Sequence, residues 1–79
     1  MDKIKPDATP RFAVCICNDE YPAALELNKI YHVLPDASAE RIGWLRVVDE
    51  SGEAYLYPGD FFQVIDVPRV VEESVLRAS

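Results

Sequence analysis

A β-hairpin predicted over residues 44–58 constrains the fold of this chain more than any other feature. The runs WLRVV and AYLYP are rich in β-favouring residues, and the turn DESG between them ends in Gly52, where a positive φ is needed. Alternation along the two arms gives an aliphatic face, Leu45, Val47 and Leu56, and an aromatic face, Trp44, Tyr55 and Tyr57. Because only one face can fill a small core, we expect the aliphatic face to be buried and the aromatic face to be exposed.

Three further strands are predicted around this hairpin. RFAVCIC and NKIYHVL precede it, and FFQVID follows it after the tight turn PGD. The segment DASAERIG is expected to form one helical turn, with Asp36 or Ser38 as its cap and Gly43 as its stop. Five short strands joined by tight turns predict an all-β fold, a small five-stranded barrel.

The chain has 79 residues, which is enough for one domain. Residues 1–10 hold two prolines and four charges, a composition typical of a flexible leader. Residues 11–67 are assigned to the barrel. Residues 68–79 are expected to form a C-terminal helix or tail, because Pro68 suits a first helical turn and Val71 and Val75 share a stripe with Val67. Since the strand pattern is complete by Asp66, we expect the barrel to form without this tail.

Acidic residues dominate the chain, whose formal net charge is −6. Between Phe12 and Asp66 there are ten acids and three bases, an excess that repels nucleic-acid phosphates and anionic membranes and favours a basic partner. No apolar run approaches the roughly 18 residues that span a bilayer, and the start MDKIKPDATPR lacks the apolar segment of a secretory signal. We therefore expect a cytoplasmic protein without nucleic-acid or membrane partners, in which both cysteines are free thiols.

Residues that commonly carry catalysis or bind metal are few. Cys15 and Cys17 share a strand face and with His32 offer three zinc ligands, but a carboxylate such as Asp36 has to complete the shell. Packing of both cysteines in the core is the preferred alternative, because the paired Cys-x-x-Cys spacing is absent. The acids of the hairpin tip are expected to be solvated: Asp49, Glu50 and Glu53. No nucleophile elbow, phosphate loop or dinucleotide fingerprint is present, so we expect no enzyme activity, no metal and no cofactor.

The order of these segments resembles that of SH3 domains over roughly residues 12–66. AVCIC takes the place of the Ala-Leu-Tyr-Asp-Tyr strand of SH3 domains. ALELNKIYHV takes the place of the segment that follows their first loop, and WLRV takes the place of their Trp-containing strand. YLYPGDFFQVI resembles the Tyr-Ile-Pro-Ser-Asn-Tyr-Val segment, with its short helical turn and last strand. The chain is also similar to small bacterial proteins that carry a YPA-LEL and YLYP pattern, which imply no activity. The resemblance implies an SH3-like barrel, although Cys15 and Cys17 stand where SH3 domains have groove tyrosines.

The same resemblance implies a binding surface. It carries Trp44, Pro58 and Phe61 onto positions that line the peptide groove of SH3 domains, and Tyr57 and Tyr21 complete the candidate set. The predicted function is a non-catalytic binding or adaptor module that takes a protein or peptide partner on this aromatic patch. The acidic charge favours a basic partner. The alternative for Trp44 alone is that it covers the barrel end or packs under the C-terminal helix.

Two further hypotheses remain open at this point. In the first, the chain is a structural or regulatory subunit, and the patch and the C-terminal helix form an oligomer interface. In the second, the chain is a small enzyme or a metal-binding protein. We expect a monomer or a weak homo-oligomer.

Overall fold

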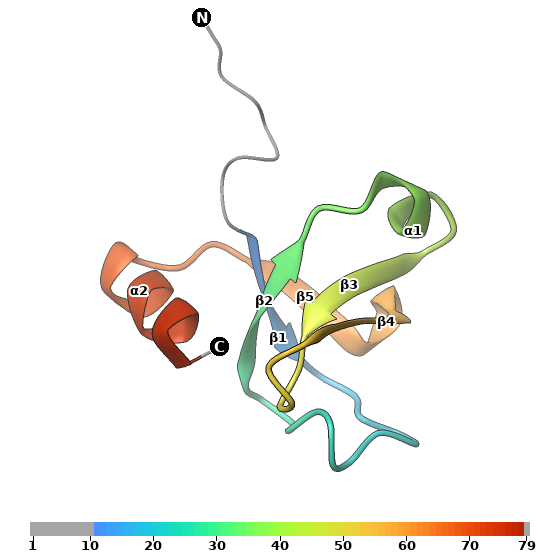
Figure 1. Cartoon of the computed structure of the whole chain (residues 1–79), viewed down its shortest axis with the longest axis horizontal. Helices are drawn as coiled ribbons and strands as arrows, with labels where there is room; N and C mark the ends of the chain where they lie inside the picture. The colour runs from blue at the N-terminus through green and yellow to red at the C-terminus, as the bar shows by residue number, and fades with distance from the viewer. Residues whose placement is uncertain (1–10, 79) are drawn as a thin grey trace, which may run out of the picture.

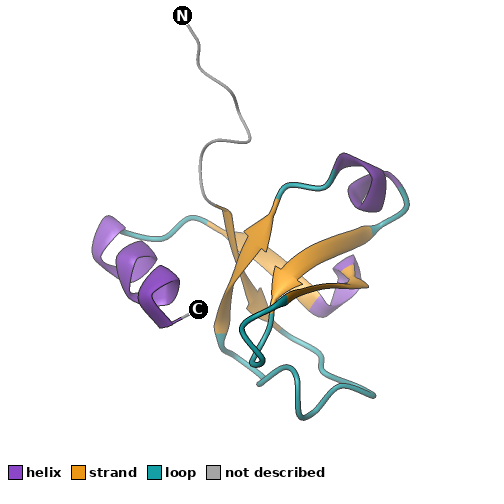
Figure 2. Ribbon diagram, in the orientation of Figure 1, coloured by secondary structure: helices purple, strands orange, loops and turns teal. Residues whose placement is uncertain are grey.

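The computed structural model describes residues 11–78, which form a five-stranded antiparallel sheet with two helices and a 3₁₀ turn (Figures 1 and 2). The elements in chain order are β1 (Arg11–Cys15), β2 (Ile30–Leu34), α1 (Ala37–Arg41), β3 (Trp44–Val48), β4 (Ala54–Pro58), η2 (Gly59–Phe61), β5 (Phe62–Ile65) and α2 (Arg69–Ala78). The strand order is β4-β3-β2-β1-β5. The predicted leader, residues 1–10, lies outside the described residues. The mostly-β composition and the short C-terminal helix are confirmed.

The predicted hairpin is confirmed as β3 and β4. Trp44 at the start of β3 pairs with Pro58 at the end of β4. The turn closes with two backbone bonds: the Asp49 amide donates to the Glu53 carbonyl at 3.1 Å, and the Gly52 amide donates to the Asp49 carbonyl at 2.9 Å. Gly52 has a φ of 84°, the left-handed conformation that the turn requires of it.

The prediction of which hairpin residues are buried is wrong for the second arm. Leu45 pairs with Tyr57, and Arg46 pairs with Leu56. Tyr57 therefore shares the inner face with Val47 and is only 4% exposed, whereas Leu56 is 40% exposed on the outer face. The reason is the loop length. A loop with an odd number of residues, 50–52, joins the arms so that odd-numbered residues face odd-numbered ones, the reverse of the expected pairing.

The core lies on one face of the sheet. Its buried residues come from all five strands and from the loop before β2: Ala13, Cys15, Leu25, Tyr31, Val33, Val47, Tyr57 and Phe62. Within residues 11–78, β4 and β5 are the two edges of the sheet and do not pair with each other. The sheet is thus not the closed barrel that the sequence predicted.

The helix α2 covers part of the opposite face. Phe12 points there because Ala13, the next residue of β1, faces the core. Phe12 pairs with His32, whose ring centroid is 5.5 Å away, and Phe12 is only 2% exposed. The helix contacts β2 (Figure 1). Val75 of α2 lines the same hollow as Ile30 of β2. Burial lowers the pKa of His32. Residues predicted to be a helix or tail therefore add a second small apolar layer. No helix in the described part combines the length and apolarity needed to cross a membrane.

Candidate binding face

Three apolar side chains lie together on the uncovered part of the sheet. Trp44 is directly opposite Pro58, and Leu56 is two residues before Pro58 on β4, so all three point away from the core. Trp44 is 36% exposed and Leu56 is 40% exposed. We call Trp44, Leu56 and Pro58 the outer face. Large apolar groups that adjoin one another in water are the usual starting point of a binding surface.

The turn η2 follows Pro58 of the outer face directly along the chain and contacts β3. Its last residue, Phe61, packs against the core. The Gly59 amide donates to the Gly43 carbonyl at 2.8 Å, which ties the turn to the residue before Trp44. The Phe61 carbonyl accepts from the amides of Ile16 at 2.8 Å and Cys17 at 3.3 Å. The chain after β1 and the chain before β5 are thereby held together at one end of the sheet.

The approach of Gly59 to Gly43 leaves no room for a side chain. A Cβ at position 59 would lie 2.7 Å from the Gly43 carbonyl oxygen, and that oxygen belongs to backbone. We expect Gly59→Ala to lower the free energy of unfolding by about 1–3 kcal/mol, because the strands must shift to admit the methyl group. Asp60→Ala, one residue away and exposed, is the control, with an expected change within about 0.5 kcal/mol. If urea unfolding shows equal losses for Gly59→Ala and Asp60→Ala, the contact between Gly59 and the Gly43 carbonyl is not tight.

The five residues predicted as a site fall into two groups. Trp44 and Pro58 belong to the outer face. Tyr21, Tyr57 and Phe61 form an aromatic cluster instead: Tyr21 packs edge-on against Tyr57 at a centroid distance of 5.0 Å and lies 6.0 Å from Phe61. Tyr21 and Phe61 are half-buried, and Tyr57 lies beneath them in the core. Tyr57 therefore supports the surface and is not part of it.

Leu56 is the residue that sequence reasoning missed. Its exposure follows from the odd-length loop and from the pairing of Arg46 with Leu56. A loop with Gly at its last position, followed by a strand, is a sequence signal for this three-residue type of turn. Reading the turn in that way assigns Leu56 to the outer face and Tyr57 to the core.

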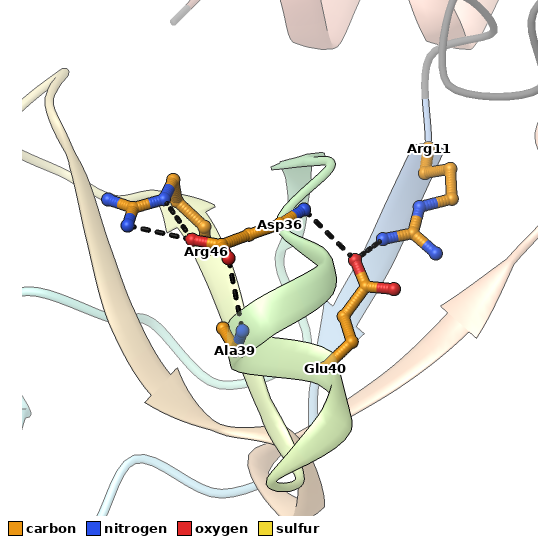
Figure 3. A network of polar contacts seen from close by, with 5 residues as sticks. All are labelled: Arg11, Asp36, Ala39, Glu40 and Arg46. Atoms are coloured by element: carbon orange, nitrogen blue, oxygen red, sulfur yellow. Dashed lines mark hydrogen bonds and ion pairs between the residues drawn. The ribbon is translucent and has the colours of Figure 1, made fainter.

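Arg46, which pairs with Leu56, is neutralised within the protein (Figure 3). Its Nε and Nη2 atoms each lie 2.8 Å from Oδ2 of Asp36, and Oδ1 of Asp36 accepts from the Ala39 amide at 3.0 Å, capping α1. The helix-capping bond from Ala39 and the bond from Arg46 lower the pKa of Asp36. Glu40 pairs with Arg11 in the same network. The guanidinium beside Leu56 therefore adds no free positive charge to the outer face.

Free carboxylates adjoin the aromatic cluster. Asp19 and Glu20 directly precede Tyr21, and Asp60 directly precedes Phe61. All three acids are exposed, and none of them forms an ion pair with another residue in the range 11–78. This end of the molecule is therefore negatively charged, which favours a cationic partner.

The opposite end of the hairpin holds a polar cluster around Asp49. This carboxylate is only 6% exposed and accepts from the Tyr57 hydroxyl at 2.5 Å and from the Ser51 amide at 2.9 Å. The Ser51 hydroxyl is a further donor. Burial by itself raises the pKa of Asp49, but the bonds from Ser51 and Tyr57 outweigh it and lower the pKa below the ordinary value of 3.8. The expectation that Asp49 is solvated is wrong, whereas Glu50 and Glu53 are exposed as expected.

Glu50 lies beside Asp49 and forms a second set of bonds. Its Oε2 atom accepts from Lys29 Nζ at 2.7 Å and from the Tyr31 hydroxyl. The bonds from Lys29 and Tyr31 lower the pKa of Glu50. Burial and the bond to Glu50 raise the pKa of the Tyr31 phenol, so the tyrosine remains the donor.

The cysteines and the histidine do not meet. Cys15 is buried in the core, where its thiol donates to the Cys17 carbonyl at 3.3 Å and burial raises its pKa. His32 points to the other face of the sheet, because it pairs with Phe12. Both cysteines are free thiols. Among residues 11–78, no group of three or more His, Cys, Asp or Glu side chains is placed to hold a metal ion.

Comparison of the chain with known protein families, with curated proteins and with solved structures found no match.

Proposed function

We propose that this chain is a non-catalytic binding module of the SH3-like kind, which holds a basic segment of a protein partner against its outer face. The assignment to an SH3-like fold is supported by η2, which lies between β4 and β5 where the resemblance implies a short helical turn. It is also supported by the placement of Trp44 and Pro58 side by side on the exposed face of the sheet.

The observation that carries the proposal is the cluster of exposed apolar side chains on the outer face. Trp44 offers a large contact area with few rotatable bonds and a polar N–H, which is why tryptophan often dominates the binding energy of interfaces. Leu56 and Pro58 extend this area on the neighbouring strand. The free carboxylates Asp19 and Asp60 give the partner its charge preference, since they attract lysine and arginine side chains.

The test uses an array of short peptides that combine basic and apolar residues. Trp44 is the only tryptophan, so its fluorescence reports directly on any peptide that contacts the outer face. We expect a basic peptide to shift the Trp44 emission, and its affinity to fall as salt is raised. In calorimetric titrations, Trp44→Ala and Leu56→Ala should each weaken binding by roughly tenfold or more, the loss typical of a central interface residue.

Tyr55→Ala is the matched control for this experiment. Tyr55 is an exposed aromatic residue on the same hairpin, but it pairs with Val47 and so points to the other face. Its removal should leave peptide affinity unchanged. If basic peptides do not shift the Trp44 emission, or if Tyr55→Ala weakens binding as much as Trp44→Ala, the outer face is not the binding surface.

Exposed apolar residues on α2 favour a second candidate, the oligomer-forming subunit. Val70 is 72% exposed and Leu76 is 39% exposed. In this case the partner of the outer face and of α2 is a second copy of the chain. Light scattering separates the candidates: a mass above that of the monomer, restored to the monomer by Leu76→Ser, supports the subunit, and a monomer at every concentration supports the peptide-binding module.

A further inference from the structure

A hollow of about 510 Å³ lies between α2 and the turn of the hairpin, and its lining includes none of the three residues of the outer face. Three segments enclose it: the start of β2, the residues 48–52 and the second half of α2. Figure 1 labels α2 and β2, two of the elements that contribute to it. The volume falls within the range of roughly 300–1,000 Å³ typical of small-molecule sites.

The hollow has an apolar floor and a polar rim. Ile30, Val48 and Val75 supply the floor, and the first two are half-buried, so part of each side chain remains available for contact. Lys29, Glu50 and Ser74 belong to the rim. A ligand that fits such walls has an apolar group and a polar or charged group at one end.

The hydrogen bonds at the rim show which polar group is missing a partner. Both donors on Glu50, from Lys29 and Tyr31, reach Oε2, and no donor from residues 11–78 reaches Oε1. The neighbouring Asp49 is different, since Ser51 occupies its Oδ1 and Tyr57 its Oδ2. The lining thus offers one open carboxylate oxygen.

The charged residues around the hollow also favour a positively charged ligand. The charged residues of the lining are Asp49, Glu50 and Lys29, so the lining is negative by one charge. The whole chain is also acidic. An anionic ligand is disfavoured at such a site, and a cationic one is favoured.

We propose that this hollow binds an amphipathic cation, a small molecule in which a protonated amine is attached to a short apolar group. The ammonium group donates to Oε1 of Glu50, and the apolar group contacts Ile30, Val48 and Val75. The site is separate from the outer face and does not depend on the function proposed for that face.

The test is a titration of the ¹⁵N-labelled full chain with four matched compounds, followed by amide chemical shifts. Hexylamine has both features of the proposed ligand, hexanol only the apolar group, methylamine only the charge, and hexanoate the opposite charge. We expect hexylamine to give saturable shifts confined to residues 28–31, 48–52 and 74–75. The other three compounds should bind at least about tenfold more weakly, the effect of losing one favourable contact of about 1.4 kcal/mol.

Two variants and one control locate the site. Glu50→Gln should weaken hexylamine binding roughly tenfold, because a charge-assisted hydrogen bond becomes a neutral one. Glu53→Gln removes the same charge from the same turn but does not line the hollow, so hexylamine affinity should not change. Ser74→Phe should abolish binding by filling the hollow from α2.

Three results overturn the proposal. Equal binding of hexanol and hexylamine means that the carboxylate plays no part. Equal losses in Glu50→Gln and Glu53→Gln mean that the amine responds only to the overall charge of the protein. Absence of saturable shifts in the wild-type chain means that the hollow takes no ligand of this class, and this comparison decides even if a variant fails to fold.

Discussion

Replacement of Phe12 by alanine is expected to lower the free energy of unfolding by about 3–5 kcal/mol, the usual cost of removing a fully buried aromatic side chain. Phe12 is 2% exposed and packs against His32 on the sheet face that α2 covers. Its removal leaves a cavity on this face of the sheet, and the loss comes from the apolar contacts of the ring. The loss in unfolding free energy is measured by urea unfolding, monitored by far-ultraviolet circular dichroism.

Trp44→Ala is the matched control. By the pairing of β1 with β2 and of β2 with β3, Trp44 points to the same face of the sheet as Phe12, and it is an even larger side chain, but it is partly exposed. We expect its removal to cost about 1 kcal/mol or less, because the contacts it loses are few. A loss of several kcal/mol for Trp44→Ala, or a small loss for Phe12→Ala, would reverse the assignment of covered and open parts of this face.

Asp49→Ala is expected to destabilise the protein by about 3 kcal/mol, the second-largest effect. The substitution leaves the buried Tyr57 hydroxyl without its acceptor and removes the bonds that hold Ser51 in the turn. Tyr57→Phe removes a single donor and should cost only about 1–2 kcal/mol. A double-mutant cycle between Asp49 and Tyr57 should therefore show coupling, and additive losses would mean that the two side chains do not interact.

The lowered pKa of Asp49 makes this stabilisation depend on pH. A carboxyl group whose pKa is lower in the folded than in the unfolded chain stabilises the fold above its ordinary pKa, and the stabilisation is lost as the pH falls through the folded value. For Asp49 this loss begins near its ordinary value of 3.8 and continues below it. Asp49→Asn should accordingly show a shallower fall in unfolding free energy below about pH 4 than the wild type. If the unfolding free energies of the two proteins fall in parallel as the pH is lowered, the pKa of Asp49 is not lowered in the folded chain.

Local sequence patterns were sufficient to predict the hairpin, the last strand and the C-terminal helix, because alternation and turn residues act over a few positions. The orientation of the second hairpin arm could not be predicted in this way. It depends on whether the loop holds an odd or an even number of residues, and a difference of one residue exchanges Leu56 with Tyr57.

The hydrogen-bond partners of individual polar side chains could not be predicted from sequence patterns either. Burial of Tyr57 is tolerated because Asp49 accepts a hydrogen bond from its hydroxyl across the hairpin, and an acidic residue in a turn gives no sign of such a role in the sequence. Closure of the sheet is also a long-range property. It requires β4 and β5 to meet, and in the described chain they remain apart.

The strand order also has a kinetic consequence. The strands β1 to β4 form a meander in which strands adjacent in sequence pair, whereas β5 pairs with β1, where Ile65 meets Phe12. Closing a loop that contains nearly the whole sheet costs more chain entropy than forming the meander, so the meander can assemble first and β5 docks late. Until β5 docks, Ala13 and Cys15 lack their strand partners on that side. We therefore expect the pairing of β5 with β1, which joins the two ends of this part of the chain, to be the slow step of folding.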